Sequence, residues 1–170
     1  MRFPAGLICS LAVLACGPAV SACADPALTK DGYLKAGFDL LGSFEFTAPN
    51  DTGAPAPPAA VAAAMAQVPA RIQGLDGRKV MVTGYMLPLK LTGNRVSEFL
   101  LVSSPMICCY GTVPQMNNWI IVRMSGPGAA ILMDSPIQFL GRLHVGKVVE
   151  DGVLAGIYLL DGEKMGDGQD

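Results

Sequence analysis

The sequence has 170 residues, of which 51% are hydrophobic and 15% charged, and its formal net charge is -2 at pH 7. This length fits one domain, and the apolar composition excludes an intrinsically disordered chain. The balance of 12 basic against 14 acidic residues argues against a general basic surface for nucleic acid, and the single histidine excludes any mechanism that needs two.

Residues 1–24 have the pattern of a secretory signal peptide. Arg2 precedes an apolar run over residues 5–15, and Gly17-Pro18 interrupts the helical pattern. The run is too short to span a bilayer, which needs about 20 residues. We therefore expect an exported protein.

Two cleavage sites fit the end of this leader. Ala22-Cys23-Ala24 suits ordinary signal peptidase and would release a periplasmic chain that begins at Asp25. Val20-Ser21-Ala22-Cys23 suits a bacterial lipobox, with a leader of residues 1–22, and would leave Cys23 lipidated as a membrane anchor. Both alternatives remain open.

Residues 25–68 are predicted to form an N-terminal extension with a linker and one short helix. Apolar pieces at 34–41 and 44–46 precede a Pro/Ala/Gly linker at 50–58. Pro57-Pro58 opens an alanine-rich run over residues 59–67, which favours a helix with proline in its first turn. Pro69 ends this run.

Residues 69–165 have the pattern of a mainly β domain, and the polar residues 166–170 form a tail. Alternating or continuous apolar runs predict five strands, at 79–87, 96–103, 119–124, 136–145 and 153–160. Asp76-Gly77 and Asp161-Gly162 are turn signals, and Gly84 interrupts the first strand as a bend or bulge would. Five strands with a bent first strand predict a small barrel of the oligonucleotide/oligosaccharide-binding (OB) type, with a sandwich as the alternative.

Cys108 and Cys109 are the only free thiols left after either cleavage. Adjacent Cα atoms lie about 3.8 Å apart, below the usual disulfide span of about 4.4–6.8 Å, so a bond between these cysteines would be strained. Three interpretations stay open. The pair is a structural staple, or a soft-metal site for Cu(I) or Zn(II) with the thioethers of Met106 and Met116, or a thiol–disulfide redox centre. Further zinc ligands would have to come from His144 or Asp134.

An ordered set of motifs resembles the exported bacterial family called domain of unknown function 3299. The motifs are Leu75-Asp76-Gly77-Arg78-Lys79-Val80, Gly84-Tyr85-Met86-Leu87-Pro88, Glu98-Phe99-Leu100-Leu101 and Cys108-Cys109-Tyr110-Gly111 with Pro114 and Asn118. The resemblance implies an envelope protein of OB topology. It also implies an association with export-linked ABC transport systems and with metal, chiefly zinc, homeostasis. Family members often carry a histidine where this chain has Tyr110 and Gly111.

Aromatic residues offer a different kind of site. Tyr85, Tyr110 and Trp119 could line an open barrel face that binds a partner protein or a glycan. Nucleotide-binding and hydrolase motifs are absent from the sequence. We therefore expect a non-catalytic accessory or binding protein, linked to soft-metal trafficking and an ABC transport system or another envelope protein. A redox protein that uses Cys108 and Cys109 and a β-barrel binding module are the alternatives.

Overall fold

The computed structural model describes residues 26–29, 31–50, 54–106, 114–133 and 135–166. These residues form a mainly β fold with three short helices and one 3-10 turn. The helical elements are α1 (Phe38–Leu41), α2 (Pro58–Met65), α3 (Ala70–Gln73) and η1 (Met116–Asn118). The strands are β1 (Leu34–Lys35), β2 (Lys79–Thr92), β3 (Arg95–Val102), β4 (Trp119–Met124), β5 (Ala129–Ala130), β6 (Ile137–Glu150) and β7 (Val153–Met165).

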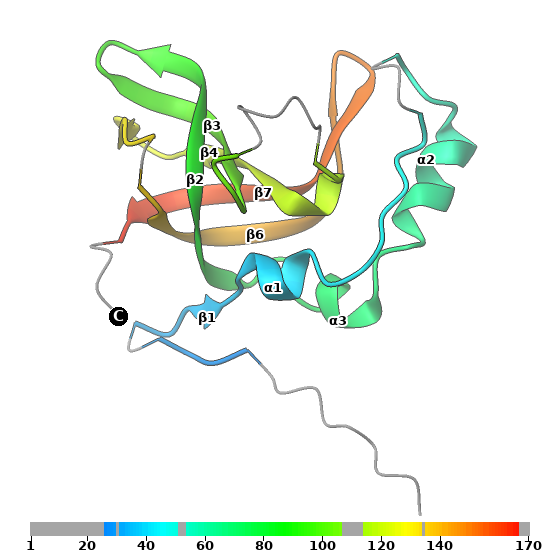
Figure 1. Ribbon diagram of the computed structural model, residues 1–170, viewed down its shortest axis with the longest axis horizontal. Coiled ribbons are helices and arrows are strands. Elements are labelled where there is room, and N and C mark those ends of the chain that lie inside the picture. Colours follow the sequence, from blue (N-terminus) through cyan, green and yellow to red (C-terminus); the bar gives the residue numbers. More distant parts are fainter. Residues whose placement is uncertain (1–25, 30, 51–53, 107–113, 134, 167–170) are drawn as a thin grey trace, which may run out of the picture.

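All seven strands belong to one sheet, in the order β1-β2-β6-β7-β4-β3-β5, and β2 additionally pairs with β3 (Figure 1). The β4–β7 and β1–β2 pairs are parallel, and the others are antiparallel. Strand β2 serves two neighbours in turn. Its first half, Lys79–Gly84, pairs with β6, and its second half, from Tyr85 to Thr92, pairs with β3.

Gly84 lies where β2 changes its partner. A Cβ at this position would lie 2.7 Å from the carbonyl oxygen of Val102 and 2.9 Å from Cγ of Leu101. A larger residue would therefore keep β2 and β3 apart, and glycine permits the close approach. The position coincides with the interruption that the sequence predicts in the first strand.

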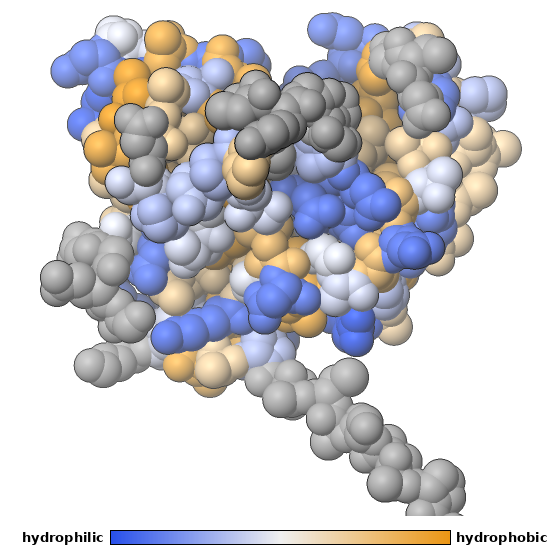
Figure 2. All heavy atoms as spheres, in the orientation of Figure 1, coloured by the Kyte–Doolittle hydropathy of each residue, from blue (hydrophilic) through white to orange (hydrophobic). Residues whose placement is uncertain are grey.

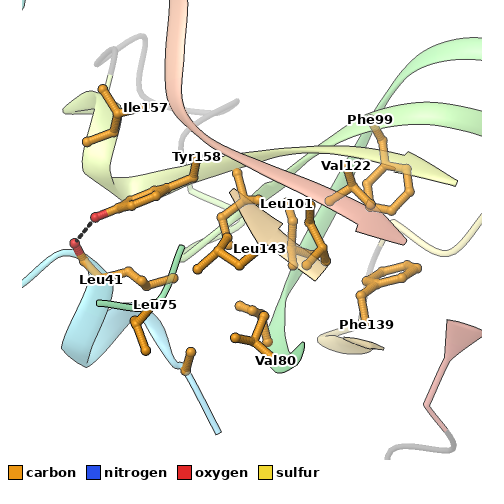
Figure 3. Packing of buried hydrophobic residues seen from close by; sticks show 14 of the residues in the cluster. Leu41, Leu75, Val80, Phe99, Leu101, Val122, Phe139, Leu143, Ile157 and Tyr158 are labelled. Atoms are coloured by element: carbon orange, nitrogen blue, oxygen red, sulfur yellow. Dashed lines mark hydrogen bonds between the residues drawn. The ribbon is translucent and has the colours of Figure 1, made fainter. Parts of the chain in front are cut away.

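The hydrophobic core joins the sheet to the segment that precedes β2 (Figure 3). Phe99 and Phe139 pack with ring centroids 4.7 Å apart. The N-terminal segment supplies Leu41 and Phe46, which are 0% and 4% exposed, so the expected extension contributes directly to the core. The buried hydroxyl of Tyr158 donates a hydrogen bond of 2.9 Å to the carbonyl of Leu41, and burial raises the pKa of Tyr158.

The five predicted strands correspond in order to β2, β3, β4, β6 and β7, whereas β1 and β5 were not predicted. The predicted alanine-rich helix corresponds to α2, but the expected number of one helix was wrong, since α1 and α3 accompany it. Asp161-Gly162 is not a turn but lies within β7. Both residues pair with β6 on one side and with β4 on the other, and two flanking neighbours keep the segment extended. Within the ranges given above, no helix has both the length and the apolar character needed to cross a membrane.

Candidate functional site

The predicted cysteine site falls on a part of the chain that the structure does not describe. Cys108, Cys109, Tyr110 and Asp134 lie outside the described residues, as does Cys23. Of the predicted thioether ligands, Met106 is 55% exposed, and Met116 lies half-buried in η1 against the core. Among the residues that can be placed, no three His, Cys, Asp or Glu side chains are arranged to hold a metal ion. The metal and redox hypotheses stay predictions.

His144 lies on β6, and its imidazole ring is close to two carboxylates. Its Nε2 atom is 2.8 Å from Oδ2 of Asp161, and its Nδ1 atom is 4.0 Å from Oδ1 of Asp76. All three side chains are well exposed, at 42% for His144 and 58% for each carboxylate. Such an exposed arrangement is typical of a solvated surface pair.

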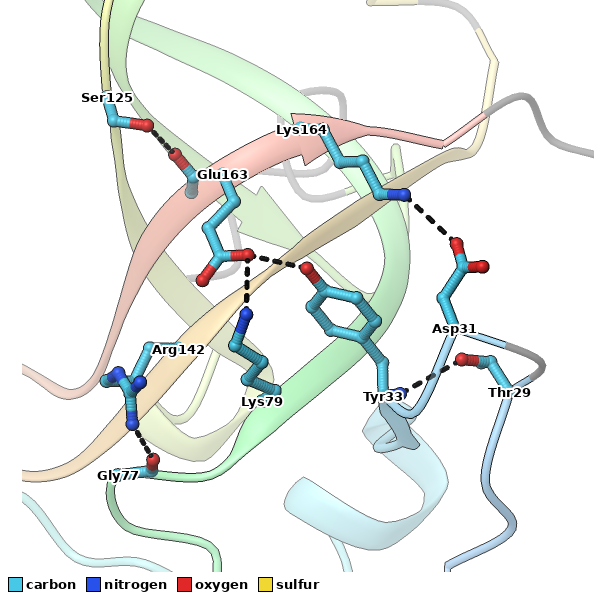
Figure 4. A network of polar contacts seen from close by, with 10 residues as sticks. Thr29, Asp31, Tyr33, Gly77, Lys79, Ser125, Arg142, Glu163 and Lys164 are labelled. Carbon is cyan, nitrogen blue, oxygen red and sulfur yellow. Dashed lines mark hydrogen bonds and ion pairs between the residues drawn. The ribbon is translucent and has the colours of Figure 1, made fainter.

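A polar cluster fastens the segment before α1 to the sheet (Figure 4). The hydroxyl of Tyr33 donates to Oε2 of Glu163 at 2.5 Å, and Nζ of Lys79 lies 3.3 Å from the same oxygen. Lys164 pairs with Asp31 at 3.0 Å. The hydrogen bond to Glu163 raises the pKa of Tyr33 to about 12 and lowers the pKa of Glu163. Because these groups satisfy one another, the cluster serves to hold the segment in place.

Two of the predicted aromatic residues lie on one face of the sheet. Tyr85 in β2 is opposite Val102 in β3, and Val102 is opposite Trp119 in β4. The residues next to them, Met86, Leu101 and Ile120, are fully buried in the core. Since successive side chains of a strand point to opposite faces, the aromatic row points away from the core.

A second apolar row follows the first on this side of the sheet. Leu87, Leu100 and Ile121 are opposite one another across the same three strands. We call the two rows together the apolar outer face. Its six members are Tyr85, Val102, Trp119, Leu87, Leu100 and Ile121. Val102 and Ile121 are 1% and 3% exposed, and the other four are half-buried.

An ionic row closes one end of the apolar outer face. Beyond a register shift in β2, Lys90 is opposite Glu98, and Glu98 is opposite Arg123. Oε2 of Glu98 lies 2.9 Å from Nζ of Lys90 and 3.3 Å from Nε of Arg123, and Arg123 also contacts Glu150 at 2.7 Å. Glu98 is only 7% exposed. A carboxylate this buried requires such compensation, so the row is a paired polar boundary.

A groove of about 540 Å³ opens beside Trp119. It is lined mainly by apolar residues, among them Phe46, Met116 and Leu154, and none of its described lining residues is charged. The indole Nε1 donates to the carbonyl of Ala155 at 3.2 Å, and a Cβ at Gly156 would lie 3.2 Å from the same nitrogen. Gly156 therefore lets the indole lie against β7, where its N–H is already bonded.

The sequence reasoning found Tyr85 and Trp119 but missed the rest of this site. Val102 and Leu100 were interpreted only as parts of the apolar run that predicts the strand at 96–103. Phe46 and Leu154 line the groove with Trp119 although they are far apart in the sequence. No local pattern marks such residues, because the fold alone brings them together.

The comparisons with known proteins agree with the predicted family. The family model described as protein of unknown function (DUF3299) matches residues 49–166. A solved structure of a DUF3299 family protein from Pseudomonas aeruginosa PAO1 is similar to this chain, with 22% identity and a TM-score of 0.50. The match covers 79% of this chain and 95% of that chain, and at this identity it shows the fold alone. No curated protein matches the sequence. The chain belongs to the DUF3299 family of proteins of unknown function.

Proposed function

We propose that this protein is a non-catalytic accessory protein of the bacterial envelope that binds an apolar segment of a partner protein. Its binding surface would be the apolar outer face together with the groove beside Trp119. The observation that carries the proposal is the row of Tyr85, Val102 and Trp119, which places two aromatic rings on one face next to an uncharged groove.

The proposal includes a closed OB-type barrel made of β2, β3, β4, β6 and β7. It is supported by the strand pairings, which run from β2 through β6, β7, β4 and β3 and return to β2. OB barrels bind their ligands on the face of the second and third strands, between the loops that join strands one to two and four to five. Here these strands are β3 and β4, and the connections are the β2–β3 and β6–β7 hairpins.

The β2–β3 hairpin carries further exposed apolar side chains next to this surface. Leu89 and Leu91 are 51% and 60% exposed, and hydrophobic residues gather over this hairpin in the space-filling view (Figure 2). Exposed clusters of aliphatic and aromatic side chains bordered by polar groups are typical of protein-binding surfaces. The ionic row of Lys90, Glu98 and Arg123 would be that border.

A partner protein fits the surface better than a glycan does. Sugar recognition relies on several amide or carboxylate groups around the aromatic rings. The six residues of the apolar outer face include none, and the groove supplies only the amides of Asn50 and Gln115. The N–H group of Trp119 is bonded to Ala155 and cannot donate to a sugar hydroxyl. The envelope location, and an ABC transport system as the source of the partner, are supported by the leader pattern and the family resemblance.

Soft-metal trafficking is the second candidate function. Met116 lines the groove, and Met106 is exposed, so the two thioethers flank the segment that carries Cys108 and Cys109. Thiolate and thioether ligands together suit soft metals such as Cu(I). The thiol–disulfide redox alternative depends on the same two cysteines.

The binding surface can be tested with the neutral apolar dye N-phenyl-1-naphthylamine. Trp119 is the only tryptophan, so quenching of its emission reports dye bound near the groove. Leu100→Ser and Tyr85→Ser should weaken dye binding. Leu132→Ser should not, because this aliphatic residue, 46% exposed and two positions after β5, is not a member of the apolar outer face. Equal effects of Leu100→Ser and Leu132→Ser would contradict the proposed surface.

A second experiment addresses the partner itself. A photo-crosslinking amino acid at position 100 should give one defined protein adduct in cells, and the same probe at position 132 should not. Tyr85→Ser in the position-100 protein should remove this adduct. An adduct that forms equally from both positions, or that persists in Tyr85→Ser, would overturn the assignment of the partner site.

A further inference from the structure

We infer that a groove between β1, α1 and α3 binds the anionic phosphate headgroups of a lipid bilayer. The inference rests on the proposed envelope location but not on the apolar outer face. It adds a second contact, with the membrane surface, to the proposed partner binding.

The groove has a volume of about 880 Å³ and gathers cations from separate parts of the chain. Lys35 comes from β1, Arg71 from α3, and Arg78 from the turn before β2, whereas Asp39 is the one acidic side chain among the described lining residues. The groove lining has more basic than acidic side chains, although the whole chain carries a formal net charge of -2. Such a surplus attracts anions.

The three cations are exposed and differ in how they are held. Nη2 of Arg71 donates to Oγ of Ser43 at 2.8 Å, and this hydroxyl donates in turn to the carbonyl of Leu40 at 2.5 Å. These hydrogen bonds fix the position of the guanidinium group of Arg71, which lines the groove. Within the part of the chain that the structure describes, the side chains of Lys35 and Arg78 have no hydrogen-bond or ion-pair partner. Arginine and lysine together suit phosphate, which arginine can bind through two parallel hydrogen bonds.

The position of the groove identifies the occupant as a bilayer. Pro26, Ala27 and Leu28 line the same groove, and Leu28 is 66% exposed. If Cys23 carries the lipid, three residue steps separate it from Pro26, a span of at most about 11 Å. Basic side chains so close to an anchor lie within the attractive field of anionic lipids.

This placement leaves the proposed partner surface accessible. β1, α1 and α3 lie together at one end of the molecule, and the β2–β3 hairpin lies at the opposite end (Figure 1). A molecule seated on the membrane through the groove would therefore direct the hairpin away from the bilayer.

The inference can be tested by sedimentation of the unlipidated chain beginning at Asp25 with vesicles. Vesicles of phosphatidylglycerol and phosphatidylcholine should bind the protein, with a partition coefficient that falls as salt is added, and vesicles of phosphatidylcholine alone should not. Lys35→Gln and Arg78→Gln should each lower the partition coefficient about fivefold. Lys147→Gln, which removes an exposed cation on β6, is the matched control and should have no effect.

Three outcomes would overturn the inference. These are equal binding to both kinds of vesicle, an equal loss in Lys147→Gln, and full competition by free glycerol phosphate, which would indicate a soluble phosphate ligand instead. Circular dichroism of the variants checks that they fold. Dye binding at the apolar outer face should be unchanged in Lys35→Gln and Arg78→Gln, so failure of this inference can be told apart from failure of the proposed function.

Discussion

Replacing Tyr158 with phenylalanine removes one buried hydroxyl and leaves the packing of the ring in place. Tyr158 is 0% exposed, and its hydroxyl donates to the carbonyl of Leu41, which is also 0% exposed, over 2.9 Å. The variant loses this hydrogen bond and leaves a buried carbonyl without its donor. An unsatisfied buried acceptor costs about 1–3 kcal/mol, so we expect Tyr158→Phe to lower the free energy of unfolding by about 2 kcal/mol.

Equilibrium unfolding in urea, followed by the emission of the single residue Trp119, measures this loss. Tyr85→Phe is the matched control, because Tyr85 is half-buried and the described residues offer its hydroxyl no partner. The control should change the free energy by less than about 0.5 kcal/mol. A loss below that value in Tyr158→Phe, or one that the control matches, would refute the reasoning that this bond holds α1 to the sheet.

Three further predictions concern backbone approach, pH and metal. Gly84→Ala should lower the free energy of unfolding by about 2 kcal/mol, because its Cβ would lie 2.7 Å from a carbonyl oxygen. Gly146→Ala is the control and should leave the free energy of unfolding nearly unchanged, because its Cβ would have no atom within 4 Å. The pKa of Tyr33 rises from 10.0 in the unfolded chain to about 12, so its contribution to stability is complete below pH 10 and is lost as the pH rises toward 12. Urea titrations across this range should show that the free energy of unfolding falls less steeply with pH in Tyr33→Phe than in the unchanged protein. An equally steep fall in both proteins would contradict the assignment. The reduced chain should bind Cu(I) or Zn(II) in competition with a chromogenic chelator, and affinities that persist in the Cys108→Ser, Cys109→Ser double variant would exclude the metal site.

The main strands could be predicted because their side chains alternate between core and surface. β4 has the predicted bounds, Trp119–Met124. The ends of β6 and β7 could not be predicted in the same way. β6 continues past Gly146, which lies in a register shift, and its pairing with β7 resumes at Val148. β7 continues through Gly162 to Met165, because Gly162 pairs with β4 on one side and with β6 on the other.

The N-terminal segment and the site depend on tertiary contacts that leave little local pattern. Phe44 and Phe46 have strand spacing but lie outside any strand, and their rings pack edge to face with centroids 6.4 Å apart. Tyr85 and Trp119 were predicted as aromatic platforms from residue type alone. Their common row became evident only from the register, which places Val102 between them.

The hydrogen bond between Tyr158 and Leu41 joins residues that are 117 positions apart, and the bond between Tyr33 and Glu163 spans 130 positions. Contacts so distant along the chain slow folding, because a long loop must close before they form. In the proposed export, the N-terminal residues would leave a translocation channel first and could not form these contacts until β7 had also passed through. The chain would stay unfolded, and thus able to pass through the channel, until synthesis and transfer were almost finished.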